Sequence, residues 1–311
     1  MRAEKIYKAA ELYYAKNLTQ QEIAKQLGIS RVTVSRMLAR AREDGMVEIR
    51  LHRPFRINRE LSLSLQEKYN LEKAEIVTSI NKEEETVSAV SSAAANLLME
   101  LVKDNDVIGV SWGGLLREIV DAMPICPKTN TKVVTLVGSL GGGKPALDGP
   151  EIARSLAAKF RGTYRFINAP AILPTTSLHD QIILSGTIPD VIDLGKSADV
   201  FLFGVGSIAD EASSLSQAGY LSAETRSQCE AQGAVGHLLA RMIDENGDSL
   251  REFNSRVLGV GLDVLKNKQK TILTVHGAEK AHVTHCALQG GYAKYLVADT
   301  DCAVKILGLT K

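Results

Sequence analysis

The stretch 18–42, LTQQEIAKQLGISRVTVSRMLARAR, constrains the fold of this chain more than any other segment. Thr19 can cap a first helix, and Glu22, three residues later, completes a capping-box pattern. Gly28 interrupts the helical pattern where a left-handed residue commonly ends a helix. Ser30 can cap a second helix, whose apolar residues recur at helical spacing. The pattern predicts two short helices joined by a tight turn, which is a helix-turn-helix.

The outward face of the predicted second helix is rich in arginine and hydroxyl side chains. A helix N-terminus ordinarily favours acidic side chains, so a basic first turn indicates an anionic partner. In a helix-turn-helix, the start of the second helix enters the DNA major groove, where arginine can donate two hydrogen bonds to guanine. The predicted groove readers are Arg31, Thr33, Ser35 and Arg36, and the predicted phosphate contacts are Gln20 and Ser30. A helical hairpin with a solvated basic face is the alternative.

The formal net charge of +1 conceals an uneven distribution. Residues 1–59 hold 13 Lys or Arg against 6 Asp or Glu, so the remainder of the chain is net acidic. A basic N-terminal part on a mildly acidic body favours nucleic-acid binding by the N-terminal part alone. We therefore expect operator DNA to be a partner of that part.

The four cysteines lie far apart and form no CxxC pair, which predicts reduced thiols in a cytoplasmic protein. No apolar run approaches membrane-spanning length, and the N-terminal segment is too charged for a signal peptide. The sequence thus predicts a soluble protein without a membrane partner.

Beyond residue 72 the chain alternates between apolar strand-like segments and helical ones. Strands are expected at 73–78, 106–111, 132–137, 164–168, 200–205, 257–262, 271–275 and 295–299. Helices are expected at 83–102, 115–122, 150–160, 188–197, 225–243 and 282–289. This alternation predicts an α/β fold with a mostly parallel sheet that helices cover on both faces.

Three parts of the chain follow from these patterns. Residues 1–56 form the helix-turn-helix domain, with a first helix at 4–16 and a short strand after the turn at Asp44 and Gly45. Residues 57–72 form a linker helix, which either pairs two subunits or packs against the body. Residues 73–311 form the effector-binding domain.

Glycines cluster where several expected strands end, in the segments 107–114, 133–142, 201–206 and 272–280. Ligands of open α/β sheets bind beyond the carboxyl ends of the strands. Glycine lets backbone N–H groups approach anionic oxygens there, and nearby helix N-termini assist. Four such segments predict a small anionic or polyhydroxy ligand.

Several motifs in this order resemble the SorC family of bacterial sugar-responsive transcription regulators, which also includes deoxyribonucleoside regulators and the central glycolytic gene regulator. The motifs are LTQQEIAKQLGISRVTVSRML, IGVSWGG, GTYRFINAPAIL, FGVGS followed by Asp210 and Glu211, VLGVGLDVLK, GAEK and LVADTDCA. The resemblance covers nearly the whole chain. It implies an effector domain similar to phosphosugar isomerases and CoA transferases, usually in a tetramer built from dimers. From the residues alone we expect a homo-oligomer, either a dimer or a tetramer.

The resemblance also implies roles for individual residues. Lys280 matches a lysine that contacts the effector's phosphate, and Asp244 matches an acid that accepts hydrogen bonds from sugar hydroxyls. The glycines that would present backbone amides to the effector are Gly113, Gly114, Gly138, Gly141 and Gly206. A solvated surface lysine and a plain turn remain the alternatives for Lys280 and Asp244.

The chain departs from the family pattern at two places. Relatives often carry Thr or Ser after the first glycine loop, whereas Leu115 and Leu116 stand here and leave only backbone donors for a phosphate. Deoxyribonucleoside-type members carry a Schiff-base lysine where this chain has Val137, so covalent capture of an aldehyde is not expected.

Two other functions compete with regulation by a sugar. A phosphosugar isomerase would need a positioned carboxylate base, and only Asp210 and Glu211 follow a glycine loop. A metal sensor could use His282, His285 and Cys286 at helical spacing. We predict neither catalysis nor a metal or cofactor, but a transcription regulator of carbohydrate-metabolism genes whose operator affinity is set by a sugar or sugar phosphate.

Overall fold

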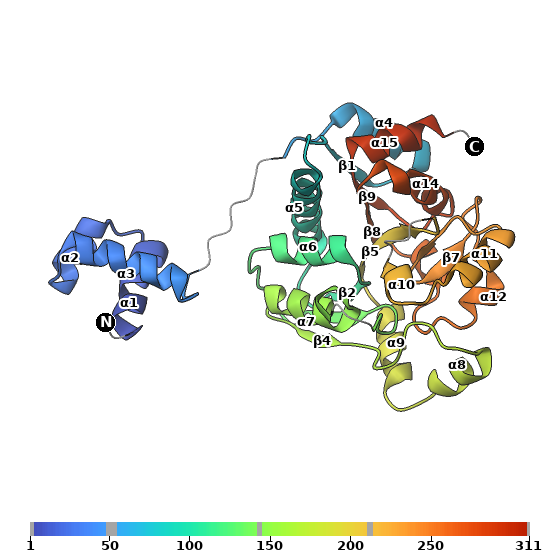
Figure 1. The fold of residues 1–311 in the computed structure, drawn as a ribbon, viewed down its shortest axis with the longest axis horizontal. Coiled ribbons are helices and arrows are strands. Elements are labelled where there is room, and N and C mark those ends of the chain that lie inside the picture. The colour runs from blue at the N-terminus through green and yellow to red at the C-terminus, as the bar shows by residue number, and fades with distance from the viewer. Residues whose placement is uncertain (1–2, 48–54, 142–144, 210–213, 310–311) are drawn as a thin grey trace. The chain divides into compact units, whose positions relative to one another are not determined.

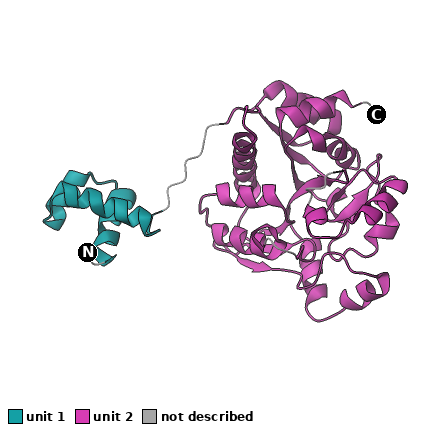
Figure 2. Cartoon of the chain, viewed as in Figure 1, with its two compact units in different colours: residues 1–52 teal, residues 53–311 magenta. Residues whose placement is uncertain are grey.

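The computed structural model describes residues 3–47, 55–141, 145–209 and 214–309. The chain forms two compact units, residues 1–52 and residues 53–311 (Figure 2). The boundary between the units follows residue 52, four residues before the expected domain boundary after residue 56. The expected linker helix, 57–72, belongs to the second unit.

The first unit is a small helical domain (Figure 1). It contains α1 (Ala3–Ala10), the π-helical turn η1 (Glu11–Ala15), α2 (Gln20–Leu27) and α3 (Arg31–Glu43). The predicted capping box of α2 is present, with the Glu22 amide donating to the Thr19 hydroxyl at 3.3 Å. Gly28 ends α2 in the left-handed conformation, with φ of 63°. The helix-turn-helix is confirmed, whereas most of its expected short strand, residues 48–54, lies outside the described residues.

The second unit is built on a parallel sheet with the strand order β1-β9-β8-β5-β2-β3-β4. Each neighbouring pair along this path is parallel. The strands are β1 (Lys73–Val77), β2 (Val107–Val110), β3 (Lys132–Thr135), β4 (Thr163–Arg165), β5 (Val200–Ser207), β8 (Lys270–Thr274) and β9 (Tyr295–Asp299). The predicted α/β class with a mostly parallel sheet is confirmed.

Helices cover both faces of the sheet, as the near-continuous apolar strands require. One face packs against α5 (Glu83–Leu101), α6 (Gly114–Ala122) and α7 (Gly149–Phe160). The other packs against α4 (Arg59–Tyr69), α9 (Ile188–Lys196), α14 (Ala281–Gln289) and α15 (Thr300–Gly308). Shorter helices at the periphery are η2 (Pro145–Leu147), α8 (Thr176–Ile182), α10 (Ser214–Gln217), α11 (Ala223–Ala231), α12 (Arg251–Asn254), α13 (Leu262–Lys266) and η3 (Ala278–Lys280).

The helix α4 packs against the body, which is one of the two expected arrangements. Ser62 accepts a hydrogen bond from the Ile76 amide of β1 at 3.1 Å. Lys68 donates to the carbonyl oxygen of Leu309, at the end of α15, at 2.7 Å. Leu65, on the apolar side of α4, is completely buried. These contacts join the first helix of the second unit to the far end of its chain.

The helix expected at 225–243 is wrong in its second half. Residues after α11 instead form a hairpin of β6 (Gly236–Leu238) and β7 (Arg241–Ile243), and β6 pairs antiparallel with β5. The residues in this stretch have good helix propensity, but Gly233, at φ of 88°, ends the helical run. Pairing with β5 and burial of both strands then outweigh the local preference.

The strand expected at 257–262 is also wrong. Its backbone makes only isolated bridges, from Val257 to Ile172 and from Gly259 to Val137, before α13 begins. Gly259 has φ of 142°, and a Cβ at this position would lie 2.4 Å from the Leu136 carbonyl oxygen. The apolar pattern at 257–262 therefore arises from burial of an irregular segment that forms no strand. Among the described residues, no helix is both long and apolar enough to cross a bilayer.

Replacing Gly138 by Ala is expected to destabilise the second unit by about 1–3 kcal/mol, because the new Cβ would lie 2.6 Å from the Pro170 carbonyl oxygen. Scanning calorimetry of the full chain measures the change. Gly308→Ala is the matched control, because a Cβ there meets nothing within 4 Å. Equal melting temperatures for the two variants would contradict the close approach at Gly138.

Candidate functional site

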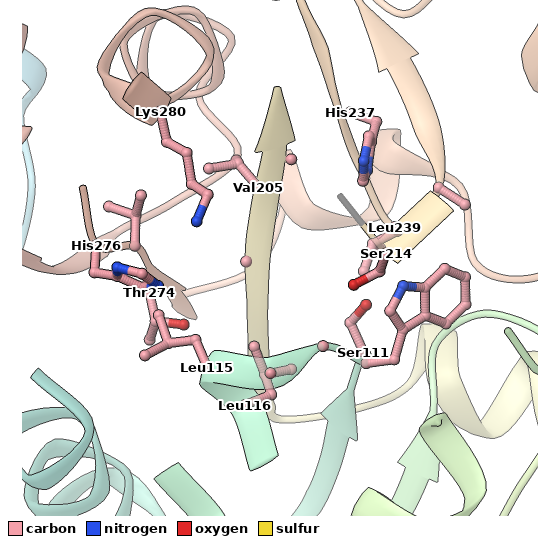
Figure 3. Close-up of a pocket in the computed structure, with 17 residues that line it drawn as sticks. Ser111, Leu115, Leu116, Val205, Ser214, His237, Leu239, Thr274, His276 and Lys280 are labelled. Carbon is pink, nitrogen blue, oxygen red and sulfur yellow. The ribbon is translucent and has the colours of Figure 1, made fainter. Parts of the chain in front are cut away.

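A cavity of about 200 Å³ lies at the carboxyl ends of β2, β5 and β8 (Figure 3). This is the edge of the sheet at which the glycine segments were expected to converge. Its wall is completed by the start of α6, by Ser214 and by the β6–β7 hairpin. Chain segments distant in sequence thus enclose one small space.

The start of α6 contributes backbone to the cavity. Gly113 caps this helix with φ of 126°, a conformation that glycine adopts readily. The first amides of a helix lack acceptors within the helix, so those of Gly114, Leu115 and Leu116 are available to an anion. The side chains of Leu115 and Leu116 line the cavity, and they add no hydroxyl group to it.

The polar side chains lie on two sides of the cavity. Figure 3 shows Lys280 and His276 on one side, with the Lys280 ammonium directed inward, and Ser111, Ser214 and His237 on the other. No Asp or Glu is among the described residues that line the cavity. The described wall therefore combines the Lys280 ammonium with imidazoles, hydroxyls and backbone amides, which suit an anionic ligand.

The position of His276 in the cavity wall shifts the pKa of its imidazole. Burial lowers the pKa of the His276 imidazole below its ordinary value, and the positive charge of Lys280 lowers it further. Its imidazole is therefore mainly neutral at pH 7 in the free protein.

The hairpin turn that forms another part of the wall is strained. Leu239 and Ala240 have φ of 45° and 61°, although neither is glycine. The buried guanidinium of Arg241 donates to the carbonyl oxygens of Leu239 at 3.3 Å and Gly259 at 3.0 Å. Burial lowers the Arg241 pKa to about 10, which still leaves it charged at pH 7. Arg241 does not line the cavity, but its hydrogen bonds stabilise the turn that does.

The structure brings four of the predicted effector residues to the cavity: Gly113, Gly114, Gly206 and Lys280. Three others lie elsewhere. The amide of Gly138 donates to the Leu258 carbonyl oxygen at 3.0 Å, and that of Gly141 donates to the carboxylate of Asp148 at 3.3 Å.

Asp244 is the third predicted residue that does not line the cavity. Its carboxylate accepts hydrogen bonds from the amides of Asn246 at 2.9 Å and Asp248 at 2.8 Å. It therefore stabilises the turn after β7, as the alternative interpretation of this segment had it.

Sequence reasoning missed several lining residues, above all His237 and His276. His237 stood in a segment expected to be helical, so its place beside β5 could not be anticipated. His276 lies two residues after the end of β8 in the glycine segment 272–280, and this position was the signal that could have identified it.

The exposed face of α3 carries most of the predicted DNA-contacting residues. Arg31, Ser35 and Arg36 are exposed, and no described residue forms an ion pair with either arginine. Arg40 differs, because it pairs with Asp44 at 2.9 Å. The same face presents Val32, which is 61% exposed and was not predicted. An exposed apolar side chain among cations can contact a thymine methyl group.

The other three predicted contacts lie at helix starts. The hydroxyls of Ser30 and Thr33 are 2.8 Å apart, and Ser30 caps α3 by accepting from the Thr33 amide. Gln20 is the first residue of α2 and is half-buried. All six residues belong to α2, α3 and the turn between them.

The residues considered for a metal site do not converge. His285 is buried and hydrogen bonds through Nδ1 to the Tyr69 hydroxyl, Cys286 is buried, and His282 is exposed. Among the described residues, no group of three His, Cys, Asp or Glu side chains could hold an ion. Asp210 and Glu211, considered for catalysis, lie outside the described residues.

A helix-turn-helix unit joined to an α/β unit with a small polar cavity defines a ligand-responsive transcription regulator as the class of protein. Comparison with known families agrees. A model for a sugar-binding domain, Sugar-bind, matches residues 53–308, and one for a Crp-like helix-turn-helix domain matches residues 8–64.

Individual relatives match this chain over nearly its full length. The deoxyribonucleoside regulator of Bacillus subtilis (strain 168) is 34% identical over 95% of this chain and 94% of its own. The sorbitol operon regulator of Klebsiella pneumoniae is 30% identical over 97% of each chain. The crystal structure of full-length SorC from Klebsiella pneumoniae superposes with a TM-score of 0.76 over 99% of each chain, at 29% identity. The chain belongs to the SorC family of sugar-binding transcriptional regulators.

Replacing Arg36 by Ala is expected to weaken specific DNA binding by about 1–3 kcal/mol, the cost of losing a bidentate contact to a base. Fluorescence anisotropy with DNA from the chain's own genomic neighbourhood measures the affinity. Arg40→Ala is the matched control, because Arg40 forms ion pairs with Asp44 and Glu43. Normal affinity of the Arg36 variant would contradict its role in the groove.

Proposed function

We propose that this protein is a DNA-binding regulator of carbohydrate-metabolism genes, and that a small sugar or sugar phosphate controls its affinity for operator DNA. The observation that carries the proposal is the cavity at the sheet edge, with Lys280 directed into it, in a chain whose other unit exposes a basic recognition helix.

The size and chemistry of the cavity support a small anionic effector. A volume of about 200 Å³ is below that of pockets for drug-sized ligands. The Lys280 ammonium and the first amides of α6 can hold a phosphate, while Ser111 and Ser214 can bond sugar hydroxyls. We propose binding without turnover, because the relatives named above are transcriptional regulators.

A contiguous set of contacts supports a route from the cavity to the linker helix. The carboxylate of Asp299 accepts from the Gly277 amide of the cavity loop at 2.6 Å and from the Cys302 amide of α15 at 2.8 Å. The helix α14 begins directly after Lys280 and carries His285, which hydrogen bonds to Tyr69 of α4. The helix α14 follows the cavity loop in the chain, and α15 is linked to that loop through Asp299. Both helices contact α4, the first helix after the DNA-binding unit in the chain.

One helix-turn-helix makes few base contacts, so the regulator is proposed to act as a homo-oligomer, a dimer or tetramer, on a two-fold operator in the cytoplasm. An effector that acts with a coupling free energy of about 1–3 kcal/mol would change the operator affinity about 5- to 150-fold. This range is sufficient for a genetic switch.

Lys280→Gln is expected to weaken binding of a phosphorylated sugar about 10- to 150-fold, because a hydrogen bond to a charged group contributes about 1.5–3 kcal/mol. A thermal-shift screen of the full chain against sugars and their phosphates identifies the ligand, and calorimetric titration measures its affinity. Lys305→Gln, on the exposed side of α15, is the matched control. If no sugar or sugar phosphate bound to the unaltered chain, the effector proposal would be wrong.

Tyr69→Phe is expected to reduce the effector-induced change in operator affinity about 5-fold, because it removes one hydrogen bond, worth about 1 kcal/mol, between α4 and α14. Effector affinity in the absence of DNA should change little. Anisotropy titrations with and without effector measure both quantities, and Tyr295→Phe in β9 is the matched control. An unchanged coupling in the Tyr69 variant would contradict this route.

A further inference from the structure

We infer that His276 is a second recognition residue for the anionic group of the effector and that it binds this group in protonated form beside Lys280. The inference deepens the proposed function and rests on it, because it assumes that an anionic sugar derivative occupies the cavity.

The placement of His276 is the first support. It stands two residues beyond the end of β8, lines the cavity, and lies on the same side as Lys280 (Figure 3). The loop between these two residues is held by Asp299, which accepts from the Gly277 amide at 2.6 Å. Both side chains therefore come from one anchored loop, and a single anionic group entering on that side can contact both.

The charges around His276 come from several elements. Burial opposes its protonation most strongly, and Lys280 of η3 opposes it further. Glu279 of η3, Asp299 at the start of α15 and Glu83 of α5 favour protonation. The opposing effects are larger, so the His276 pKa lies below its ordinary value in the free protein.

A bound anion reverses this balance. A phosphate close to the ring favours the imidazolium, and it offsets the repulsion from Lys280. The imidazolium donates an N–H hydrogen bond to a phosphate oxygen, and the proton that it gains comes from solvent. Binding of the anion is therefore coupled to uptake of one proton by His276.

The affinity for the anion depends on pH because the His276 pKa differs between the free protein and the complex. The His276 pKa is low in the free protein and higher in the complex. The additional affinity is therefore fully present below the free-state pKa, and it is lost as the pH rises through the bound-state pKa. An uncharged sugar lacks this effect, so discrimination in favour of the phosphorylated sugar should increase as the pH falls.

The test uses the full chain and calorimetric titration with ribose 5-phosphate, glucose 6-phosphate, fructose 6-phosphate and inorganic phosphate at pH 6, 7 and 8. Titrations in buffers of different ionisation enthalpy report the protons taken up. His276→Gln is the test variant, and His282→Gln is the matched control because His282 is exposed on α14. The phosphate's own titration is common to all three proteins, so the ratio of their affinities isolates His276.

The ratio of wild-type to His276→Gln affinity is expected to increase as the pH falls from 8 to 6, toward a limiting value of about tenfold for each unit by which the anion raises the His276 pKa. The variant should lose the proton uptake, and His282→Gln should keep it. Equal pH dependence and equal proton uptake in all three proteins would overturn the role of His276 and leave the proposed function intact. Binding of none of the four probes to the wild type would overturn the premise that an anionic group occupies the cavity, and the role of His276 with it, whereas the sugar screen described above tests the proposed function itself. If the Gln variant does not fold, His276→Asn replaces it in the same comparison.

Discussion

The close approach of β5 and β6 is the contact on which the cavity depends. At Gly206, a Cβ would lie 2.2 Å from Nε2 of His237, and at Gly236 it would lie 2.5 Å from the Gly206 carbonyl oxygen. Two glycines therefore permit a hairpin to lie across the carboxyl end of a central strand. This pairing places His237 and the turn of Leu239 and Ala240 in the wall, and it gives the sheet edge a partly enclosed cavity.

The cavity has a cationic side formed by one loop. Gly277, Ala278 and Glu279 separate His276 from Lys280, and Asp299 holds the Gly277 amide. The same loop leads into α14. The strands position this loop, which places His276 and Lys280 at the cavity, and the following helix reaches α4. The proposed ligand contacts and the contact with the linker helix thus come from one short loop and the helix that follows it.

Sequence patterns were reliable where local chemistry decides structure. Thr19, Glu22 and Gly28 set the bounds of α2 because capping and left-handed geometry are local requirements. The apolar runs of the parallel sheet were also recognisable, since burial on both faces demands them. The hairpin at 236–243 was not predicted, because its residues have good helix propensity and only pairing with β5 makes them strands.

The sequence by itself determined a helix-turn-helix, a parallel α/β sheet and glycines at the strand ends, because capping, apolar periodicity and backbone sterics act over a few residues. Only the tertiary structure decided which glycines share the cavity. Gly113 and Gly206 line it, whereas Gly138 is packed against Pro170. Tertiary structure likewise placed His276 and Lys280 on the same side of it. The physical reason is that the enclosure arises from contacts between segments far apart in the chain, and no local pattern records which of them meet.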